Sequence, residues 1–152
     1  MALLLSVAAI GFGFSARRWS RLAERSRVGA RSESEVRREL ARLEHRGWRL
    51  RHSLAWRWRG DIDSVAIAPN GVAFVIETKT RSYDERHLAV VREQAAWLWH
   101  RRRRWCSQGV LPVLCMVRER GVHRCEQGVL VVSIDQLLPW LRETAAGGSQ
   151  RV

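Results

Sequence analysis

The chain has 152 residues, of which 46% are hydrophobic and 28% are charged. This length suits one domain with a single core, and the composition excludes both a disordered chain and a polytopic membrane protein. The 27 lysines and arginines outnumber the 15 acidic residues, and the net charge of +12 predicts a polyanionic partner, either nucleic acid or an anionic membrane surface. A solvated arginine-rich surface without such a partner is the alternative.

The amino-terminal stretch over residues 2–14 is almost entirely apolar, and three arginines follow it closely. It is shorter than the roughly 20 residues that a membrane-spanning helix needs, and it lacks the basic region and cleavage site of a signal peptide. Residues 1–28 are therefore interpreted either as a marginal membrane anchor with a cytoplasmic basic flank, or as a packed or linking segment. The expected location is cytoplasmic, with membrane attachment through residues 2–14 left open.

The first element of the domain is an amphipathic helix, because apolar residues recur at helical spacing at Val36, Leu40 and Leu43. Gly47 supplies the stop signal. Glu33 lies on the same apolar stripe, where an acid is uncommon, so we expect a functional role for it and prefer it to Glu35. The alternative is a first-turn carboxylate that interacts favourably with the helix dipole.

An alternating segment follows, with mostly apolar residues at even positions from Trp48 to Trp58 and mostly arginine at odd positions. A period of two predicts a strand or an extended edge with a single apolar face. The arginines of the opposite face are candidates for binding nucleic-acid phosphates: Arg49, Arg51, Arg57 and Arg59.

Residues 62–68 and 72–80 form two further predicted strands, which are apolar on both faces and therefore central in a covered sheet. The intervening Pro-Asn-Gly predicts a hairpin with a three-residue loop. Closure of that loop by Ala68 and Val72 places Asp63 directly opposite Glu77.

Lys79 shares a face with Glu77, because strand residues two apart point the same way. Opposed carboxylates in buried strands repel one another, and a divalent cation with oxygen ligands would neutralise both. Lys79 offsets only one charge. The alternative is a structural ion-pair cluster of Asp63 and Glu77 with Lys79 and nearby arginines.

A second helix is predicted from about Asp84 to Trp105, and its apolar stripe carries the polar residue Gln94. A buried amide needs a hydrogen-bond partner, so Gln94 is either a supporting site residue or a satisfied core glutamine. Arginines at the end of this helix are further candidates for phosphate contacts, unless they form only a solvated helix end: Arg101, Arg102, Arg103 and Arg104. The neighbouring tryptophans Trp97, Trp99 and Trp105 are expected to pack, with base stacking as the alternative.

Two strands over residues 110–117 and 129–132 precede a final helix, Ile134 to Arg142, for which Ser133 and Gln136 predict a capping box. The expected fold is α/β, with a mixed central sheet of about five strands flanked by helices. The domain is expected over residues 29–143, with a disordered tail over residues 144–152.

The cysteines Cys106, Cys115 and Cys125 match neither a zinc-ligand pattern nor a disulfide framework. Unpaired thiols in a reducing compartment are the simplest interpretation. His123 and Cys125 alone are a weak metal-ligand signal.

The segment from Gly60 to Lys79 reads GDIDSVAIAPNGVAFVIETK. It resembles the signature of the nuclease-related domain (NERD) family, within the PD-(D/E)XK restriction-endonuclease-like superfamily. The likeness extends from about Gly29 to Arg142 and includes the first-helix acid, Gln94 and the strand around Val113. The resemblance implies a restriction-endonuclease-like core and Mg²⁺-dependent hydrolysis of phosphodiester bonds in nucleic acid, with DNA as the expected substrate.

The resemblance also implies a catalytic set at five positions: Glu33, Asp63, Glu77, Lys79 and Gln94. The implied ligands of a Mg²⁺ or Mn²⁺ ion are Asp63, Glu77, Glu33 and the backbone carbonyl of Thr78. Lys79 would orient or activate the attacking water, and Gln94 would be a supporting polar group.

Three positions depart from the family pattern. Ser32 stands where the family has glycine, Ser64 where it has histidine and Thr80 where it has asparagine. None of these departures removes a charge from the expected site. The competing hypothesis is a non-catalytic basic module on the same fold that binds nucleic acid or associates with a membrane.

Overall fold

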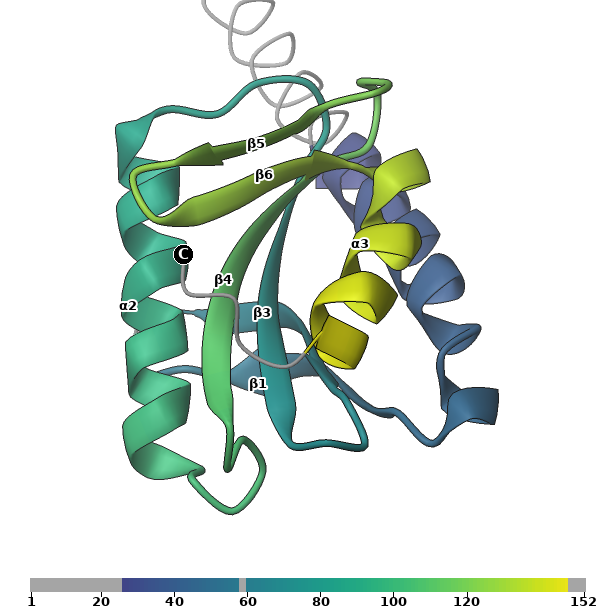
Figure 1. The fold of residues 1–152 in the computed structure, drawn as a ribbon. Coiled ribbons are helices and arrows are strands. Elements are labelled where there is room, and N and C mark those ends of the chain that lie inside the picture. Colours follow the sequence, from purple (N-terminus) through teal and green to yellow (C-terminus); the bar gives the residue numbers. More distant parts are fainter. Residues whose placement is uncertain (1–25, 58–59, 148–152) are drawn as a thin grey trace, which may run out of the picture.

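A computed structural model describes residues 26–57 and 60–147. Its strands are β1 (Arg49–Ala55), β2 (Asp61–Ile67), β3 (Val72–Lys79), β4 (Gly109–Met116), β5 (His123–Glu126) and β6 (Val129–Ser133). Its helices are a first helix described over residues 26–41, the 3-10 helix η1 (Glu44–Arg46), α2 (Glu85–Arg101) and α3 (Ile134–Gly147). The first helix and α3 cover one face of the sheet, and α2 covers the other (Figure 1).

The sheet is mixed and has six strands in the order β1-β2-β3-β4-β6-β5. β1, β2 and β3 are antiparallel, whereas β4 pairs in parallel with both β3 and β6. A mixed sheet flanked by helices confirms the expected α/β class and is consistent with a restriction-endonuclease-like core. The additional edge strand is β5, whose side chains are mostly exposed and whose sequence HRCE carries no alternating signal.

Two hydrophobic cores lie on opposite faces of the sheet. The first core joins Val36 and Leu40 of the first helix, and Leu43 just after it, to α3 and β3. Within this core the Phe74 ring lies 5.8 and 5.5 Å, between centroids, from two tryptophan rings. The second core lies under α2. Alternate residues of β3 enter the two cores, with Phe74 in the first and Val75 in the second. The same alternation directs Thr78 toward the first core, and Glu77 and Lys79 toward α2.

The β2–β3 hairpin has the predicted loop and register. Ser64 pairs with Ile76, and the ladder continues to Ile67 and Ala73. The N–H of Gly71 donates to the carbonyl of Ala68 over 2.9 Å. Gly71 has φ of +90°, and a Cβ there would lie 2.3 Å from Ser107 Oγ, so this turn position requires glycine.

The prediction of a single apolar face over residues 48–58 is wrong. Trp48 and Leu50 pack in the first core, whereas Leu54 and Trp56 pack against the second, on the opposite side of the sheet. Between these pairs lies Ser53, with a φ of +49° that non-glycine residues seldom adopt. The partner strand makes the same change, because Ala66 packs in the first core and Ile62, which pairs with Leu54, packs in the second. Trp58 and Arg59 lie outside the described residues.

Several predicted helix ends also differ. Residues 26–28, assigned from sequence to the amino-terminal segment, are already helical, and α2 ends at Arg101 rather than Trp105. α3 continues to Gly147, so residues 144–147 are helical rather than a disordered tail. Ala145 holds this last turn in place, because it packs against the first core and its carbonyl accepts a 2.7 Å hydrogen bond from Asn70 Nδ2. Residues 148–152 are outside the described part.

The capping box expected at Ser133 is absent from its predicted place. The hydroxyl of Ser133 instead accepts a hydrogen bond from the N–H of Val122 at 3.0 Å, and Gln136 Nε2 donates to Asp135 at 3.0 Å. Ser133 therefore ties the preceding loop to the start of α3.

The three cysteines are free, with Cys106 and Cys115 buried and Cys125 exposed. Within the described ranges, no helix has the length and apolar character that crossing a membrane requires. The apolar stretch at residues 2–14 lies outside those ranges.

Candidate active site

Asp63 and Glu77 lie on neighbouring strands at the point where the β2–β3 ladder ends. The last pair of the ladder is Ser64 with Ile76, one step before Asp63 and Glu77. Beyond it, Asp63 Oδ2 accepts a 2.8 Å hydrogen bond from the backbone N–H of Thr78. A side-chain carboxylate thus takes the place of a main-chain acceptor and is held in a defined orientation.

The surroundings of Asp63 oppose its ionisation. Burial raises its pKa from 3.8 to about 7, and the neighbouring carboxylates of Glu77 and Glu33 contribute to the rise. The Thr78 N–H and the Lys79 ammonium act in the opposite direction. The balance favours a proton or another cation on Asp63 at neutral pH.

Lys79 pairs with Glu77 on the α2 side of the sheet. Its Nζ lies 2.9 Å from Glu77 Oε1, and the two side chains are 24% and 14% exposed. One ammonium offsets one carboxylate, so an ionised Asp63 leaves the three-residue group with a net charge of −1. This residual charge provides the electrostatic attraction that a divalent cation needs.

The donor set at this place suits Mg²⁺. The N–H of Thr78 points toward Asp63, and because the N–H and C=O of one strand residue point the same way, its carbonyl lies on that side too. Asp63, Glu77 and this carbonyl offer hard oxygen atoms. Protein sites for Mg²⁺ commonly use one or two carboxylates and leave the other positions to water or substrate phosphate.

Glu33 is near the pair but does not complete a three-carboxylate site. Within the described ranges, no three His, Cys, Asp or Glu side chains are grouped so that they could hold a metal. Glu33 Oε2 is instead 3.4 Å from a guanidinium nitrogen of Arg37 one helical turn away. A role of Glu33 as a direct metal ligand stays a prediction. Glu35, the alternative helix acid, forms two hydrogen bonds of 2.7 and 3.0 Å with Arg118.

Arg37 is a neighbour of the site that sequence reasoning missed. Besides approaching Glu33, it donates a 2.9 Å hydrogen bond to Ser53 Oγ, the residue with positive φ in β1. Its Nε is buried and has no hydrogen-bond partner among the described residues. The spacing of Glu33 and Arg37 signals the ion pair, but nothing local in the sequence signals the contact with β1.

Two of the departures from the family pattern contact each other. Ser32 Oγ lies 3.1 Å from Thr80 Oγ1 and joins the first helix to the end of β3. At the third departure, Ser64 Oγ is 2.9 Å from His52 Nδ1 of the adjacent strand. Burial, and then the charge of Arg37, lower the pKa of His52, so its imidazole is neutral at pH 7.

Gln94 is 2% exposed and lies on the sheet-facing side of α2, in line with Val91 and Leu98. Its Oε1 has no hydrogen-bond partner within the described ranges, and no hydrogen bond described there joins it to Asp63 or Glu77. The structure therefore brings Asp63, Glu77, Thr78 and Lys79 together and places Glu33 nearby. It leaves Gln94 as a buried amide on the same side of the sheet.

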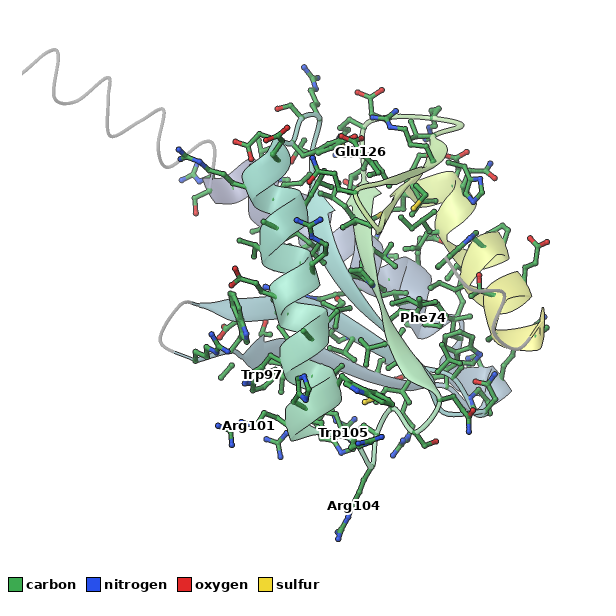
Figure 2. All side chains as sticks on the ribbon, turned by 60° about the vertical axis from the view of Figure 1, so that its left-hand side comes forward. Phe74, Trp97, Arg101, Arg104, Trp105 and Glu126 are labelled. Carbon is green, nitrogen blue, oxygen red and sulfur yellow. The ribbon has the colours of Figure 1, made fainter. Side chains whose placement is uncertain are left out.

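One of the β1 arginines predicted to bind phosphate reaches the arginine-rich end of α2. Arg51 extends from β1 so that its guanidinium carbon lies 5.6 Å from the centre of the Trp105 ring, just beyond α2. Arg101 and Arg104 point outward at the same end of α2, where Trp97 and Trp105 also lie (Figure 2). Arg57 lies beyond the point in β1 where the apolar residues change faces, and its guanidinium carbon is 6.0 Å from the centre of the Trp56 ring.

The fold and this paired-carboxylate site define a mixed α/β protein with a restriction-endonuclease-like core. The family model for the nuclease-related domain matches residues 28–113, from the first helix to the middle of β4. The chain belongs to this family, whose general class is the PD-(D/E)XK superfamily. No curated protein and no solved structure matches it.

Proposed function

We propose that this chain is a Mg²⁺-dependent nuclease that hydrolyses phosphodiester bonds, with DNA as its substrate. The observation that carries the proposal is the partly buried pair of Asp63 and Glu77, in which desolvation and mutual repulsion raise the pKa of Asp63 to about 7. A family of nuclease-related domains supplies the reaction class, and the net charge of +12 suits a polyanionic substrate.

The residues divide the work by their chemistry. Asp63 and Glu77, with the carbonyl of Thr78, would hold the cation, and the Thr78 N–H fixes the direction of the Asp63 carboxylate. When bound, Mg²⁺ supplies a Lewis acid for the scissile phosphate and lowers the pKa of a water molecule. Lys79 places a positive charge beside Glu77, where it would stabilise the charge that develops on the phosphate in the transition state.

The test is a cleavage assay with the purified chain and labelled linear, circular and single-stranded DNA, together with RNA. Each substrate is incubated with Mg²⁺, Mn²⁺ or EDTA. We expect cleavage of DNA with either metal ion and none with EDTA, and we expect Asp63→Asn to be inactive. Equal cleavage by Asp63→Asn would contradict the assignment of the site.

A non-catalytic nucleic-acid-binding module is the second candidate. The ion pair between Lys79 and Glu77 favours it, because at 2.9 Å the lysine already neutralises one of the two acids without a metal. Under this alternative, DNA binding is the same with Mg²⁺ and with EDTA, and no substrate is cut. A membrane-associated role would depend on residues 2–14, and fractionation with and without that segment tests it.

A further inference from the structure

The arginine and tryptophan side chains at the end of α2 form two groups of cation–π contacts. The guanidinium carbons of Arg51 and Arg102 lie 5.6 and 5.2 Å from the ring centre of Trp105. The guanidinium carbon of Arg103 lies 4.7 Å from the ring centre of Trp99. We call these five residues the stacking surface. It unites β1 with the end of α2, although 54 positions separate Arg51 from Trp105 in the chain.

We propose that the stacking surface binds unpaired bases of a single-stranded nucleic acid, so that the nuclease acts on single strands or on single-stranded segments. This inference rests on the proposed function for the identity of the ligand. It adds a substrate preference and assigns a role to Trp99 and Trp105.

The chemistry of the surface favours a base on each ring and a phosphate on each guanidinium. Trp99 and Trp105 are partly exposed, and the arginines that approach them are exposed. Stacking of a base on an aromatic ring is worth a factor of about 5 to 150 in affinity, whereas an exposed cation–π contact is worth a factor of about 2 to 5. A base can therefore replace a guanidinium on the ring, and the released arginine can contact the adjoining phosphate.

The stacking surface and Glu77 share one side of the sheet. Arg51 precedes the change of faces at Ser53, and its contact with Trp105 places it on the α2 side, toward which Glu77 also points. Arg51 pairs with Val65 in β2, and Asp63 lies two residues further along that strand. One strand spacing and two residue steps put the backbones of Arg51 and Asp63 about 8 Å apart. One nucleic-acid strand can therefore contact both.

Single strands fit this arrangement better than a duplex does. In a duplex the faces of the bases are stacked on one another, so a tryptophan ring on the protein surface has access only to terminal or unpaired bases. The arginines, in contrast, can contact the phosphates of a single strand or of a duplex. A preference for a strand with bases over an abasic strand with the same number of phosphates therefore reports on the tryptophans.

The experiment measures the binding of oligonucleotides to the full chain in EDTA, where no metal-dependent cleavage occurs. The ligands are a thymidylate oligonucleotide, an abasic oligonucleotide with the same number of phosphates, and a duplex of equal length. We expect the wild-type chain to bind the thymidylate strand about tenfold more tightly than the abasic strand. Equal affinities for the two would overturn the proposal without any variant.

Trp105→Leu tests the ring. We expect it to weaken binding of the thymidylate strand about tenfold, to change abasic binding less than about twofold, and to leave the salt dependence unchanged. Arg51→Gln should instead weaken all three ligands and reduce the slope of log affinity against log salt by about 0.7 on single strands. Trp105→Phe keeps an aromatic ring in the packed position, so binding should be intermediate even if the leucine variant proves unstable.

The matched control is Trp140→Leu, because Trp140 is also partly buried but packs on Phe74 in the first core, on the other face of the sheet. It should leave every affinity unchanged. The proposal would be overturned if Trp105→Leu weakened thymidylate and abasic binding by the same factor. It would also be overturned if Trp105→Leu weakened binding to phosphatidylserine vesicles and left oligonucleotide binding unchanged. Because binding is measured in EDTA, absence of cleavage in Mg²⁺ would refute only the proposed function.

Discussion

The backbone N–H of Thr78 donates to Oδ2 of Asp63 across 2.8 Å, at the end of the β2–β3 ladder. This one hydrogen bond links the hairpin to the chemistry of the site. It stabilises the ionised form of Asp63, while burial and the charge of Glu77 favour the protonated form more strongly. Asp63 is consequently a carboxyl group whose charge depends on pH and on a bound cation.

The first prediction concerns stability without metal. The pKa of Asp63 is about 7 in the folded chain, against 3.8 ordinarily. The folded state therefore binds this proton more tightly, and the resulting stabilisation is complete below pH 3.8 and is lost as the pH rises through 7. Asp63→Asn lacks this dependence, so the stability of the variant relative to the wild type should rise by on the order of 2–4 kcal/mol between pH 4 and pH 8. Urea unfolding of both proteins in EDTA measures it, and a pH-independent difference would refute the raised pKa.

The second prediction is that protons compete with Mg²⁺ for the site. Because the Asp63 pKa is about 7, we expect Mg²⁺ affinity to fall up to about tenfold per pH unit below 7 and to level off above it. Calorimetric titration between pH 5.5 and pH 8.5 measures this. Glu35→Gln is the matched control, since Glu35 pairs with Arg118 outside the site, and it should preserve the same profile. Pronounced weakening that begins only below about pH 4 would mean that Asp63 ionises normally.

The third prediction separates catalysis from binding at Lys79. Lys79→Ala should lower kcat about 100-fold and change substrate affinity by less than about threefold, because many arginines contribute to binding in the ground state. Lys79→Arg should recover part of the rate. Loss of the ammonium also removes an interaction that lowers the Asp63 pKa, so the pH profile of the alanine variant should move upward. Equal losses in turnover and affinity would make Lys79 an ordinary phosphate contact.

The hairpin could be predicted because its information is local. The Pro-Asn-Gly turn, with Gly71 at a φ of +90°, and the apolar runs on either side determine the loop and its register, and the register brings Asp63 to Glu77. The buried stripe of the first helix follows in the same way from helical periodicity. These elements depend on residues close in sequence.

The features that could not be predicted depend on contacts between distant segments. The alternating pattern continues through Ser53, so the sequence gives no signal of the left-handed backbone there. It also gives no signal that Trp48 and Trp56 pack in different cores. The contact of Arg37 with Ser53 joins residues 16 positions apart, and that of Arg51 with Trp105 joins a strand to a helix end. Such contacts follow from sheet twist and helix packing, for which periodicity carries no signal.

The fourth prediction concerns the turn that sets the register. Gly71→Ala should destabilise the fold by about 2–3 kcal/mol, because it places a side chain at positive φ and a Cβ 2.3 Å from Ser107 Oγ. Gly29→Ala is the control. Gly29 lies in the first helix, and a Cβ added there would meet no atom within 4 Å, so alanine should stabilise by about 0.5–1 kcal/mol. Unfolding curves of both variants measure the difference, and an unaffected Gly71→Ala would show that the turn tolerates another conformation.

The last prediction concerns the exposed arginines that extend past the tryptophans. Arg101 and Arg104 point outward from the end of α2 (Figure 2). Among the described residues, the cation–π contacts at this helix end involve Arg102 and Arg103 rather than these two. Replacing both with glutamine should weaken binding to single strands and duplexes alike. If each contacts one phosphate, the slope of log affinity against log salt should fall by about 1.4 on single strands and about 1.8 on duplexes.

Turnover at saturating substrate should survive in this double variant, because Asp63, Glu77 and Lys79 lie on β2 and β3 rather than at the end of α2. Arg120→Gln, which changes an exposed arginine beyond β4 near α3, is the control for net charge and should leave the slope unchanged. An unchanged slope in the double variant would mean that Arg101 and Arg104 face only solvent. Collapse of saturated turnover with an unchanged slope would instead mean that this end of α2 supports the active site, through the helix that also buries Gln94.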